Sequence, residues 1–514
     1  MADESSSKTA ADNAEEGLKT YLTGLSYLAT ASQNGMSALF RYANEFIIPY
    51  LLATNYFRDV EATKLWRQDP LKTFKDYTDL GLFNLDLCSR ALTGALNAFG
   101  DYLRLDSSKR LEALTPLLLS GDWSGIEQLL RRKTELLQLM AFRYPQAIQA
   151  IEPEYGFHFE RGDNPKVAET DRFTLYQVLP NAPGVAVRNG GKPVLILPPY
   201  VLGANILGFL PGENRSYAHC FANQGIPTYI RILKDIQFTE ALQIMTGEDD
   251  ARDTRTFCEA IRKRHGRETT LNGYCQGGFS ALCNLLSGEL DGLVDVFITC
   301  VAPMDGTRSD GLSSFLANLP QRFNDLEYGT KTLPNGNQVA DGKLMGWVYK
   351  LRSIEDESPV AAFYRDLMMF VGQRGTEFKI SKTAAGLNYW LNNERNDLPM
   401  EITRMSFISY NTPIASDGTL PVKLFGRTLN LKRLPAKRIP WLICYGLNDN
   451  LVEPPTALAP LDHVEAEVSA FPKGHVAIAT SWSDPASACA LHTRFGDTNC
   501  RGPVRFHLDL EAGG

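Results

Sequence analysis

Two patterns of apolar residues divide the chain near residue 165. Over residues 18–165, apolar positions recur at three- and four-residue steps, as in the run 125–140, which is typical of amphipathic helices. Asp122, just ahead of that run, is a suitable N-cap. Residues 1–17 are small, acidic and polar, and this composition predicts a disordered tail. We therefore expect a helical N-terminal region, 18–165, behind a disordered tail.

Beyond residue 165, short apolar runs alternate with helical stretches such as 252–265. The runs with strand character cover residues 173–179, 194–197, 228–233, 270–274, 294–301, 441–445 and 464–471. Strands separated by helices predict a mainly parallel sheet that is covered on both faces. The alternation is lost over residues 304–436, which indicates a cap inserted between two strands. The sequence thus predicts an α/β catalytic domain over residues 166–514, with the cap insertion at 304–436.

Composition narrows the classes of function. The chain has 514 residues and a formal net charge of -7, so it lacks the broad basic surface that nucleic-acid binding requires. Its nine cysteines are scattered and none forms a C-x-x-C pair, which fits a reducing compartment. The acidic start is unlike a signal peptide, and no apolar run is long enough to span a membrane. We therefore expect a cytoplasmic chain.

The most informative motif surrounds Cys275. The segment 270–286 runs from a β-like stretch through Gly273-Tyr274-Cys275-Gln276-Gly277 into a helical pattern. This order of strand, tight turn and helix is typical of a nucleophile elbow, here with sulfur in place of the usual serine oxygen. The alternative is a glycine-rich turn that holds a buried thiol.

An elbow nucleophile needs a base and an orienting acid, which follow it in the order acid and then histidine. Asp449 comes just after the strand predicted at 441–445, and His475 just after the one predicted at 464–471. Open α/β sheets place ligands at the carboxyl ends of their strands. The sequence therefore predicts a triad of Cys275, Asp449 and His475. Residue spacing matches no phosphate-binding loop, dinucleotide motif or zinc site, so we expect neither a metal nor a cofactor.

Motifs around and beyond the triad resemble those of polyhydroxyalkanoate synthases. The cysteine box at 273–278 and the histidine loop at 474–477 are similar to that family's. Further similarity lies at 198–201 and 210–216 after an early strand, at 388–393 (Asn-Tyr-Trp-Leu-Asn-Asn) in the cap, and at 429–431 before the acid-bearing strand. The resemblance covers roughly residues 40 to 480.

The resemblance implies an α/β-hydrolase fold with a cap and a helical N-terminal region. It also implies an acyltransferase that polymerises 3-hydroxyacyl-CoA into polyhydroxyalkanoate and releases CoA. In that scheme Cys275 attacks the thioester, His475 takes the thiol proton, and Asp449 orients the histidine or helps to activate the incoming hydroxyl. We expect the backbone amides of Gln276 and Val201 to bind the oxyanion. The family further suggests a homodimer, a growing polyester chain as bound partner, and a place at the surface of polyester granules.

Three departures from the family pattern keep other functions open. Asn450 stands where the family has histidine, Leu202-Gly203 replaces asparagine-lysine, and Arg231-Ile232 replaces serine-tryptophan. One alternative is a thioesterase or esterase that uses the same triad with water as the acceptor. The other is a scaffold that binds granules or partners without catalysis.

Overall fold

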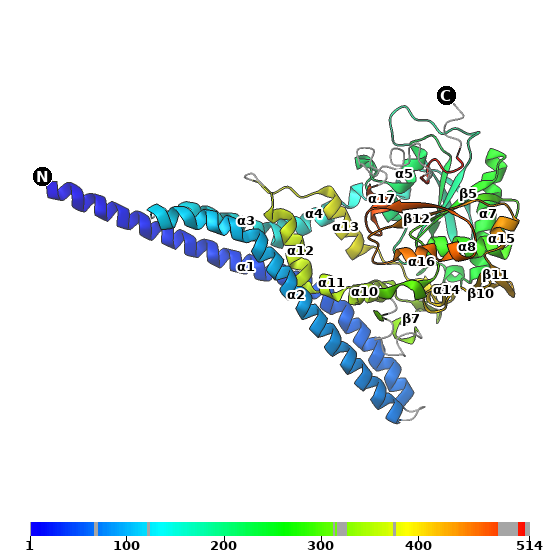
Figure 1. Ribbon diagram of the computed structural model, residues 1–514, viewed down its shortest axis with the longest axis horizontal. Helices are drawn as coiled ribbons and strands as arrows, with labels where there is room; N and C mark the ends of the chain where they lie inside the picture. The colour runs from blue at the N-terminus through cyan, green and yellow to red at the C-terminus, as the bar shows by residue number, and fades with distance from the viewer. Residues whose placement is uncertain are drawn as a thin grey trace. The chain divides into compact units, whose positions relative to one another are not determined.

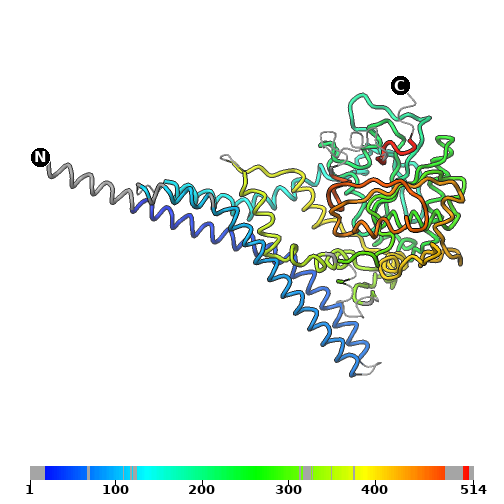
Figure 2. Tube along the Cα trace, in the orientation of Figure 1, coloured from blue at the N-terminus to red at the C-terminus, as the bar shows by residue number. Residues whose placement is uncertain are grey.

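The computed structural model describes residues 2–65, 70–120, 124–311, 314–315, 326–373, 377–481 and 502–508. Their packing divides the chain into two units. The helical unit comprises Met1–Ile151 and Trp347–Asn388, and the sheet unit comprises Glu152–Gly346 and Tyr389–Gly514. Figure 2 follows the chain through both units. Asp122, the suggested N-cap, lies outside the described residues.

The helical unit contains long helices drawn in blue and cyan in Figure 1. Its elements are α1 (Ala2–Leu65), α2 (Pro70–Ser120), α3 (Ser124–Gln138), the π-helical turn η1 (Leu139–Arg143), α4 (Tyr144–Ala150), α11 (Ile354–Glu357) and α12 (Pro359–Val371). Two further helices, α10 (Gly342–Arg352) and α13 (Lys382–Asn393), carry the chain across the boundaries of the units. Within the unit, α12 packs on α1 and α2, and α11 packs on α2.

Part of the segment predicted as a cap therefore belongs with the N-terminal helices. Two polar contacts join these parts of the chain inside the helical unit. Tyr42 donates a hydrogen bond to Asp366 at 2.6 Å, and Arg90 forms an ion pair with Glu355 at 2.5 Å. The insertion at 304–436 is thus divided, because residues 347–388 pack with the helical unit and the flanking stretches pack with the sheet unit.

The structure and the sequence prediction differ over residues 2–17. Composition predicts a disordered tail there, whereas α1 begins at Ala2. The segment is rich in alanine and glutamate, which have high helix propensity. A helix can continue through such a segment on backbone hydrogen bonds alone, even where the residues are too polar to form a core.

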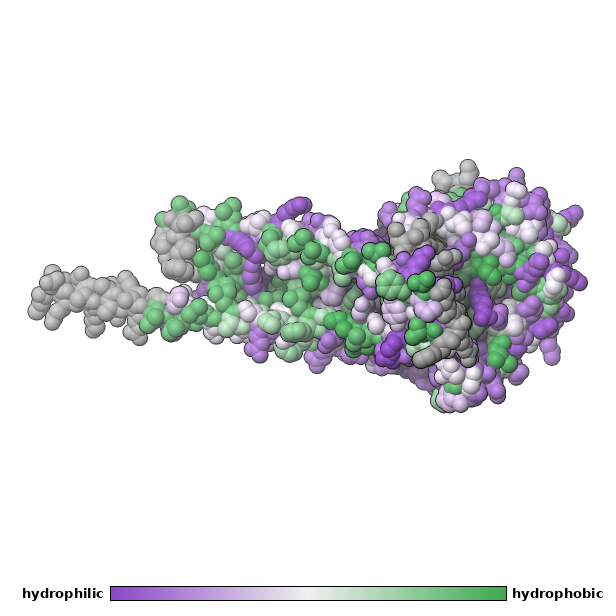
Figure 3. Space-filling model, turned by 90° about the horizontal axis from the view of Figure 1, so that it is seen from below, coloured by the Kyte–Doolittle hydropathy of each residue, from purple (hydrophilic) through white to green (hydrophobic). Residues whose placement is uncertain are grey.

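Large apolar side chains are exposed along the helical unit, as Figure 3 shows for one face. On α2 they include Leu71, Phe74, Leu82, Leu85, Leu92 and Leu96, and on α1 they include Leu18, Leu22, Leu25, Met36, Phe40, Ile47 and Leu51. These six α2 positions recur at steps that place them on one side of the helix. Within the described ranges, no helix combines the length and hydropathy needed to cross a bilayer.

The sheet unit is built on eight strands in the order β1-β2-β4-β3-β5-β6-β12-β13. They are β1 (Lys166–Glu169), β2 (Phe173–Val178), β3 (Val194–Leu197), β4 (Thr228–Leu233), β5 (Thr269–Tyr274), β6 (Val294–Cys300), β12 (Trp441–Gly446) and β13 (Glu467–Phe471). The strands from β4 to β13 pair in parallel, and β1 and β2 are antiparallel at one edge. This confirms the predicted mainly parallel sheet.

Helices and two small β-structures complete the sheet unit. The helices are α5 (Tyr217–Ala222), α6 (Glu240–Gln243), α7 (Gly247–His265), α8 (Gln276–Ser287), α14 (Met400–Asn411), α15 (Arg433–Ala436), α16 (Pro454–Leu458) and α17 (Ala477–Ser481). The small sheets are β7 (Thr330–Thr332), β8 (Gln338–Ala340) and β9 (Leu398–Pro399), and the hairpin β10 (Thr419–Leu424) with β11 (Arg427–Asn430). Since β6 and β12 are neighbours in the sheet, the long segment between them is an insertion.

The sheet unit begins earlier than the change of pattern at residue 165. Its first residues, from Glu152, form short 3₁₀ turns rather than strands. Tyr155 packs its ring against Phe209 at a centroid distance of 5.9 Å, and Phe157 is also buried. These aromatic contacts bring the turns into the sheet unit, although the sequence pattern there is neither helical nor strand-like.

Candidate active site

Cys275 lies at the turn between β5 and α8. Its φ of 51° and ψ of -126° are values that non-glycine residues rarely adopt, so the turn is strained. A Cβ atom at Gly273 would overlap the backbone of Gly278, and one at Gly277 would overlap the carbonyl group of Leu197. Glycine is therefore required on both sides of the cysteine. The turn places the thiol at the N-terminus of α8, where the helix dipole favours negative charge.

Asp449 and His475 form a buried pair after the neighbouring strands β12 and β13. Nδ1 of His475 donates a hydrogen bond to Oδ2 of Asp449 at 2.8 Å. The other carboxylate oxygen, Oδ1, accepts from the backbone amides of Leu451 and Val452, both at 2.9 Å. Because both of its oxygens accept hydrogen bonds, the carboxylate is held in one position and orients the imidazole.

The surroundings of His475 favour its charged form. Burial lowers the pKa of His475, but the charge of Asp449, the charge of Cys275 and hydrogen bonds with both outweigh it and raise the pKa to about 10. Among the described residues, Nε2 has no partner in full hydrogen-bond geometry. The thiol is thus close enough to interact with the imidazole, yet the two are not fully aligned, as is common before substrate binds.

The structure accordingly brings together all three residues of the predicted triad. Cys275 follows β5, Asp449 follows β12 and His475 follows β13, at the carboxyl ends of parallel strands. The hydroxyl of Tyr274 donates to the backbone oxygen of His475 at 2.9 Å, which ties the histidine loop to the elbow. Another histidine in this unit, His219, is buried without a carboxylate partner, and burial lowers its pKa to about 4.

The two predicted oxyanion donors lie on facing segments. The backbone amide of Val201 donates to the side-chain Oε1 of Gln276 at 3.3 Å. Gln276 is the first residue of α8, so its own backbone amide belongs to the helix turn that has no intrahelical acceptor. The Val201 amide is therefore already bonded to the Gln276 side chain in this structure.

The sequence did not reveal what holds the loop that carries Val201. Asn396 donates from its backbone to Val201 O and from its side chain to Tyr200 O, both at 3.0 Å. The indole of Trp390 donates to Leu202 O at 3.0 Å. In the sequence, Trp390 stands out only as part of the motif at 388–393. Asn396 gave no signal, because its acceptors are backbone carbonyls that are distant in sequence.

A cavity of about 470 Å³ opens beside this loop. Its walls include Tyr200 from the loop, Leu233 at the end of β4, and Tyr155 and Glu394. The triad residues do not line it, and Cys275 is only 3% exposed. The cavity therefore adjoins the predicted oxyanion site, while the thiol itself is closed from solvent.

The described residues also bear on metal and disulfide chemistry. No group of three or more histidine, cysteine, aspartate or glutamate side chains in these ranges could ligate a metal ion. The described cysteines are free thiols. Burial raises the pKa of Cys220 and Cys258 to about 12, and also raises that of Cys283. These three thiols are thus neutral near pH 7. A nucleophilic cysteine reacts as the thiolate, so these three are poor candidates for that role.

Comparison with known proteins gives matches in structure alone. No protein-family model matches the chain, and no curated protein matches its sequence. Solved structures do match. An α/β-fold hydrolase from Bacillus anthracis str. Sterne is 13% identical, with 62% of this chain and 94% of the other covered and a TM-score of 0.34. A structure from work on carboxylesterases of Nitrososphaera gargenis is 11% identical, with 62% and 92% covered and a TM-score of 0.34.

A third structure, the thioesterase domain from the curacin biosynthetic pathway, is 11% identical, with 62% and 94% covered and a TM-score of 0.34. What decides the fold is the topology: the strand order, the tight turn after β5, and the acid and histidine loops after β12 and β13. The chain has the α/β-hydrolase fold. The predicted fold class is thereby confirmed, including the helical N-terminal region, and the long insertion lies between β6 and β12.

Proposed function

We propose that this α/β-hydrolase-fold protein transfers acyl groups from thioesters or esters through a covalent thioester on Cys275. The observation that supports this most directly is the buried Asp449–His475 pair beside Cys275, in which the pKa of His475 is raised to about 10. A histidine that holds its proton next to a thiol favours an imidazolium–thiolate pair. The thiolate is the nucleophilic form of cysteine.

The reaction proceeds in two balanced halves. The Cys275 thiolate attacks the acyl carbon, the bond to the leaving group breaks, and the His475 imidazolium gives its proton to the departing thiolate or alkoxide. The backbone amides of Gln276 and Val201 bind the oxyanion that forms during attack. In the second half, His475 takes a proton from the acceptor, whose oxygen attacks the acyl thioester and releases the Cys275 thiolate.

Hydrolysis is the first candidate for the second half. It needs no binding site beyond the triad and the oxyanion donors, because water is the acceptor. The polar cavity of about 470 Å³ beside the loop that carries Val201 has room for water near that side of the site. In this form the protein is a cysteine-dependent thioesterase or esterase.

Polymerisation is the second candidate, and the closed nucleophile favours it. Cys275 is 3% exposed and His475 7% exposed. Excluding water from an acyl enzyme leaves time for an alcohol to attack instead. The motif resemblance supplies the substrate, a 3-hydroxyacyl-CoA whose own hydroxyl is the acceptor, so that CoA leaves and a polyester grows.

Incubation of the full chain with 3-hydroxybutyryl-CoA tests the proposal and separates the two acceptors. We expect CoA release, measured with a thiol reagent, and an acyl adduct on the peptide that contains Cys275. Hydrolysis gives one free 3-hydroxybutyrate per CoA. Polymerisation gives far less free acid and an insoluble product that yields monomer on methanolysis. The absence of both CoA release and an acyl adduct would contradict the proposed function.

The exposed apolar face of α2 supports a further part of the polymerising candidate. A polyester surface offers ester and alkyl groups but few charges, and Leu85, Leu92 and Leu96 are each more than 60% exposed on the same side of α2. Burial of one leucine side chain is worth about 1.5–3 kcal/mol. We propose that this face attaches the helical unit to the granule surface.

Changing Leu85, Leu92 and Leu96 together to glutamine is expected to lower the fraction of protein bound to polyhydroxybutyrate particles by at least about tenfold. A pelleting assay measures it. Asn97→Gln, on an exposed polar position of α2, is the control and should bind as the wild type does. Unchanged binding by the triple variant contradicts the attachment. A shift from dimer to monomer in sedimentation would instead assign this face to the homodimer that the family resemblance suggests.

A further inference from the structure

A buried ion pair lies behind the loop that follows β3. Arg231 of β4 is 2% exposed and Asp250 of α7 is fully buried, and Nη1 of Arg231 lies 2.6 Å from Oδ1 of Asp250. Placing two charges in a core is unfavourable unless further hydrogen bonds satisfy both groups. The residues that form hydrogen bonds with Arg231 and Asp250 therefore indicate the role of the ion pair.

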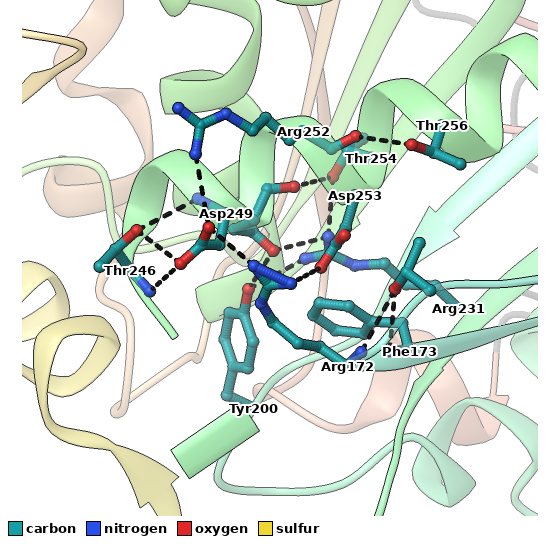
Figure 4. A network of polar contacts seen from close by, with 12 residues as sticks. Arg172, Phe173, Tyr200, Arg231, Thr246, Asp249, Arg252, Asp253, Thr254 and Thr256 are labelled. Atoms are coloured by element: carbon teal, nitrogen blue, oxygen red, sulfur yellow. Dashed lines mark hydrogen bonds and ion pairs between the residues drawn. The ribbon is translucent and has the colours of Figure 1, made fainter. Parts of the chain in front are cut away.

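The additional partners come from three other positions. Tyr200 donates its hydroxyl hydrogen to Oδ1 of Asp250 at 2.6 Å, and Nη2 of Arg231 donates to that same hydroxyl oxygen at 3.0 Å. Nη1 of Arg231 also donates to Thr254 at 2.8 Å. Figure 4 shows the side chains of Tyr200, Arg231 and Thr254 converging. The second carboxylate oxygen, Oδ2, accepts from Asn284 at 2.7 Å.

The charge states suit these hydrogen bonds. Burial raises the pKa of Tyr200 well above its usual value, so the hydroxyl keeps the proton that it donates. Burial alone would lower the pKa of Arg231, but the charge of Asp250 more than compensates, so the guanidinium stays charged. Tyr200 and Arg231 therefore both keep the protons that they donate near neutral pH.

One carboxylate thus contacts a residue on each of the two segments that carry the predicted oxyanion donors. Its Oδ1 holds Tyr200, the residue immediately before Val201. Its Oδ2 holds Asn284 on α8, the helix whose first residue is Gln276. The distance between the two backbone amides depends on how the β3 loop sits against α8. A shift of about 1 Å in such a site can lower a rate about a hundredfold.

We propose that Asp250, Arg231 and Tyr200 are positioning residues that hold the Val201 amide at a fixed distance from the Gln276 amide. The role rests on the proposed function, because it concerns the oxyanion of the same reaction. Tyr200 is the link that can be removed with least disturbance. Its change to phenylalanine leaves the ion pair of Arg231 with Asp250 and the bond from Asn284 in place.

Tyr200→Phe is expected to lower kcat for thioester turnover by about ten- to a hundredfold, with KM within about twofold of the wild type. Backbone amide exchange in the peptides covering residues 198–203 should accelerate. Alkylation of Cys275 by iodoacetamide should keep its rate, because that reaction has no oxyanion. The matched control is Tyr229→Phe, which removes another buried hydroxyl between β4 and α7, bonded to His265 at 2.7 Å. It should leave kcat and the exchange at 198–203 unchanged.

Each other outcome overturns the positioning role. Unchanged exchange at residues 198–203 shows that Tyr200 does not hold the loop, whether or not the protein turns over. Faster exchange with unchanged kcat shows that the held loop does not serve the reaction. A wild type that shows no turnover and no acyl adduct on the peptide containing Cys275 after exposure to 3-hydroxybutyryl-CoA removes the proposed function and the positioning role with it. If the wild type turns over and Tyr200→Phe has the same kcat and the same amide exchange, only the positioning role is contradicted and the proposed function stands.

Discussion

Cys275→Ala is expected to lower the release of CoA from an acyl-CoA by at least about a thousandfold. The change deletes the sulfur that forms the acyl enzyme in the proposed reaction. Burial raises the pKa of Cys283, on the same helix, and of Cys258, so both stay protonated and poorly nucleophilic. The measurements are the initial rate of thiol release and the mass of the protein after exposure to substrate.

Cys283→Ala is the matched control, since it removes another buried thiol from α8. It should keep the activity within about twofold of the wild type and lower only the thermal stability, because it leaves a small cavity in the core. Turnover that persists in Cys275→Ala would show that the nucleophile has been assigned to the wrong residue. Loss of activity in both variants would point to damage in α8 rather than to missing chemistry.

The strands and the elbow could be predicted from the sequence, because both depend on residues that are close together in the chain. The run at 194–197 is apolar throughout, as a strand buried on both faces must be, and it matches the observed β3. The run at 228–233 matches β4, although Arg231 interrupts its apolar residues. Gly273 and Gly277 are required by overlaps that any side chain would cause. The strand β1 was missed because Lys166–Glu169 is short and partly exposed, with no apolar run to mark it.

Contacts between residues that are far apart in the sequence could not be predicted in the same way. The separation of residues 347–388 from the rest of the insertion depends on contacts such as Tyr42 with Asp366. Nothing in the local sequence distinguishes these residues from other buried polar ones. Arg231 likewise stood out only as a departure from a family pattern, because its partner Asp250 is one of several acidic residues at the start of α7.

The triad could be predicted in part, since it combines local motifs with contacts between residues that are far apart in the sequence. Its members could be named from their order and from their places after strands, and the structure brings them together. Their catalytic roles remain predictions, because only kinetics can assign them. The support for the oxyanion loop, from Asn396 and Trp390, could not have been named, since it consists of hydrogen bonds to backbone carbonyls.

Asp449→Asn is expected to lower kcat by about a thousand- to ten-thousandfold while the fold is retained. Oδ1 of Asp449 accepts from the amides of Leu451 and Val452, so the oxygen of an asparagine must take that place. The NH₂ group then faces Nδ1 of His475 and forces it to act as an acceptor. Nε2 must carry the proton, and the histidine can no longer take one from the thiol.

The pH dependence gives the variant a second readout. In the wild type the pKa of His475 is about 10, compared with an ordinary value of 6.5. Its contribution to the free energy of unfolding is therefore complete below pH 6.5 and is lost as the pH rises through 10. Asparagine removes the main charge that raises this pKa, so the variant should lose less stability between pH 6.5 and 10 than the wild type. Denaturant titrations at several pH values measure the difference.

Alkylation of Cys275 should change in parallel. In the wild type, the rate with iodoacetamide should depend little on pH up to pH 9, because His475, whose pKa is raised to about 10, keeps its positive charge beside the sulfur. In Asp449→Asn the rate at pH 7 should fall at least tenfold and rise with pH, as for a free thiol. Asp305→Asn, another buried aspartate that accepts backbone amides, should show the wild-type profile. Identical profiles for Asp449→Asn and the wild type would mean that the carboxylate does not control the proton on His475, and the triad would reduce to a cysteine and a histidine.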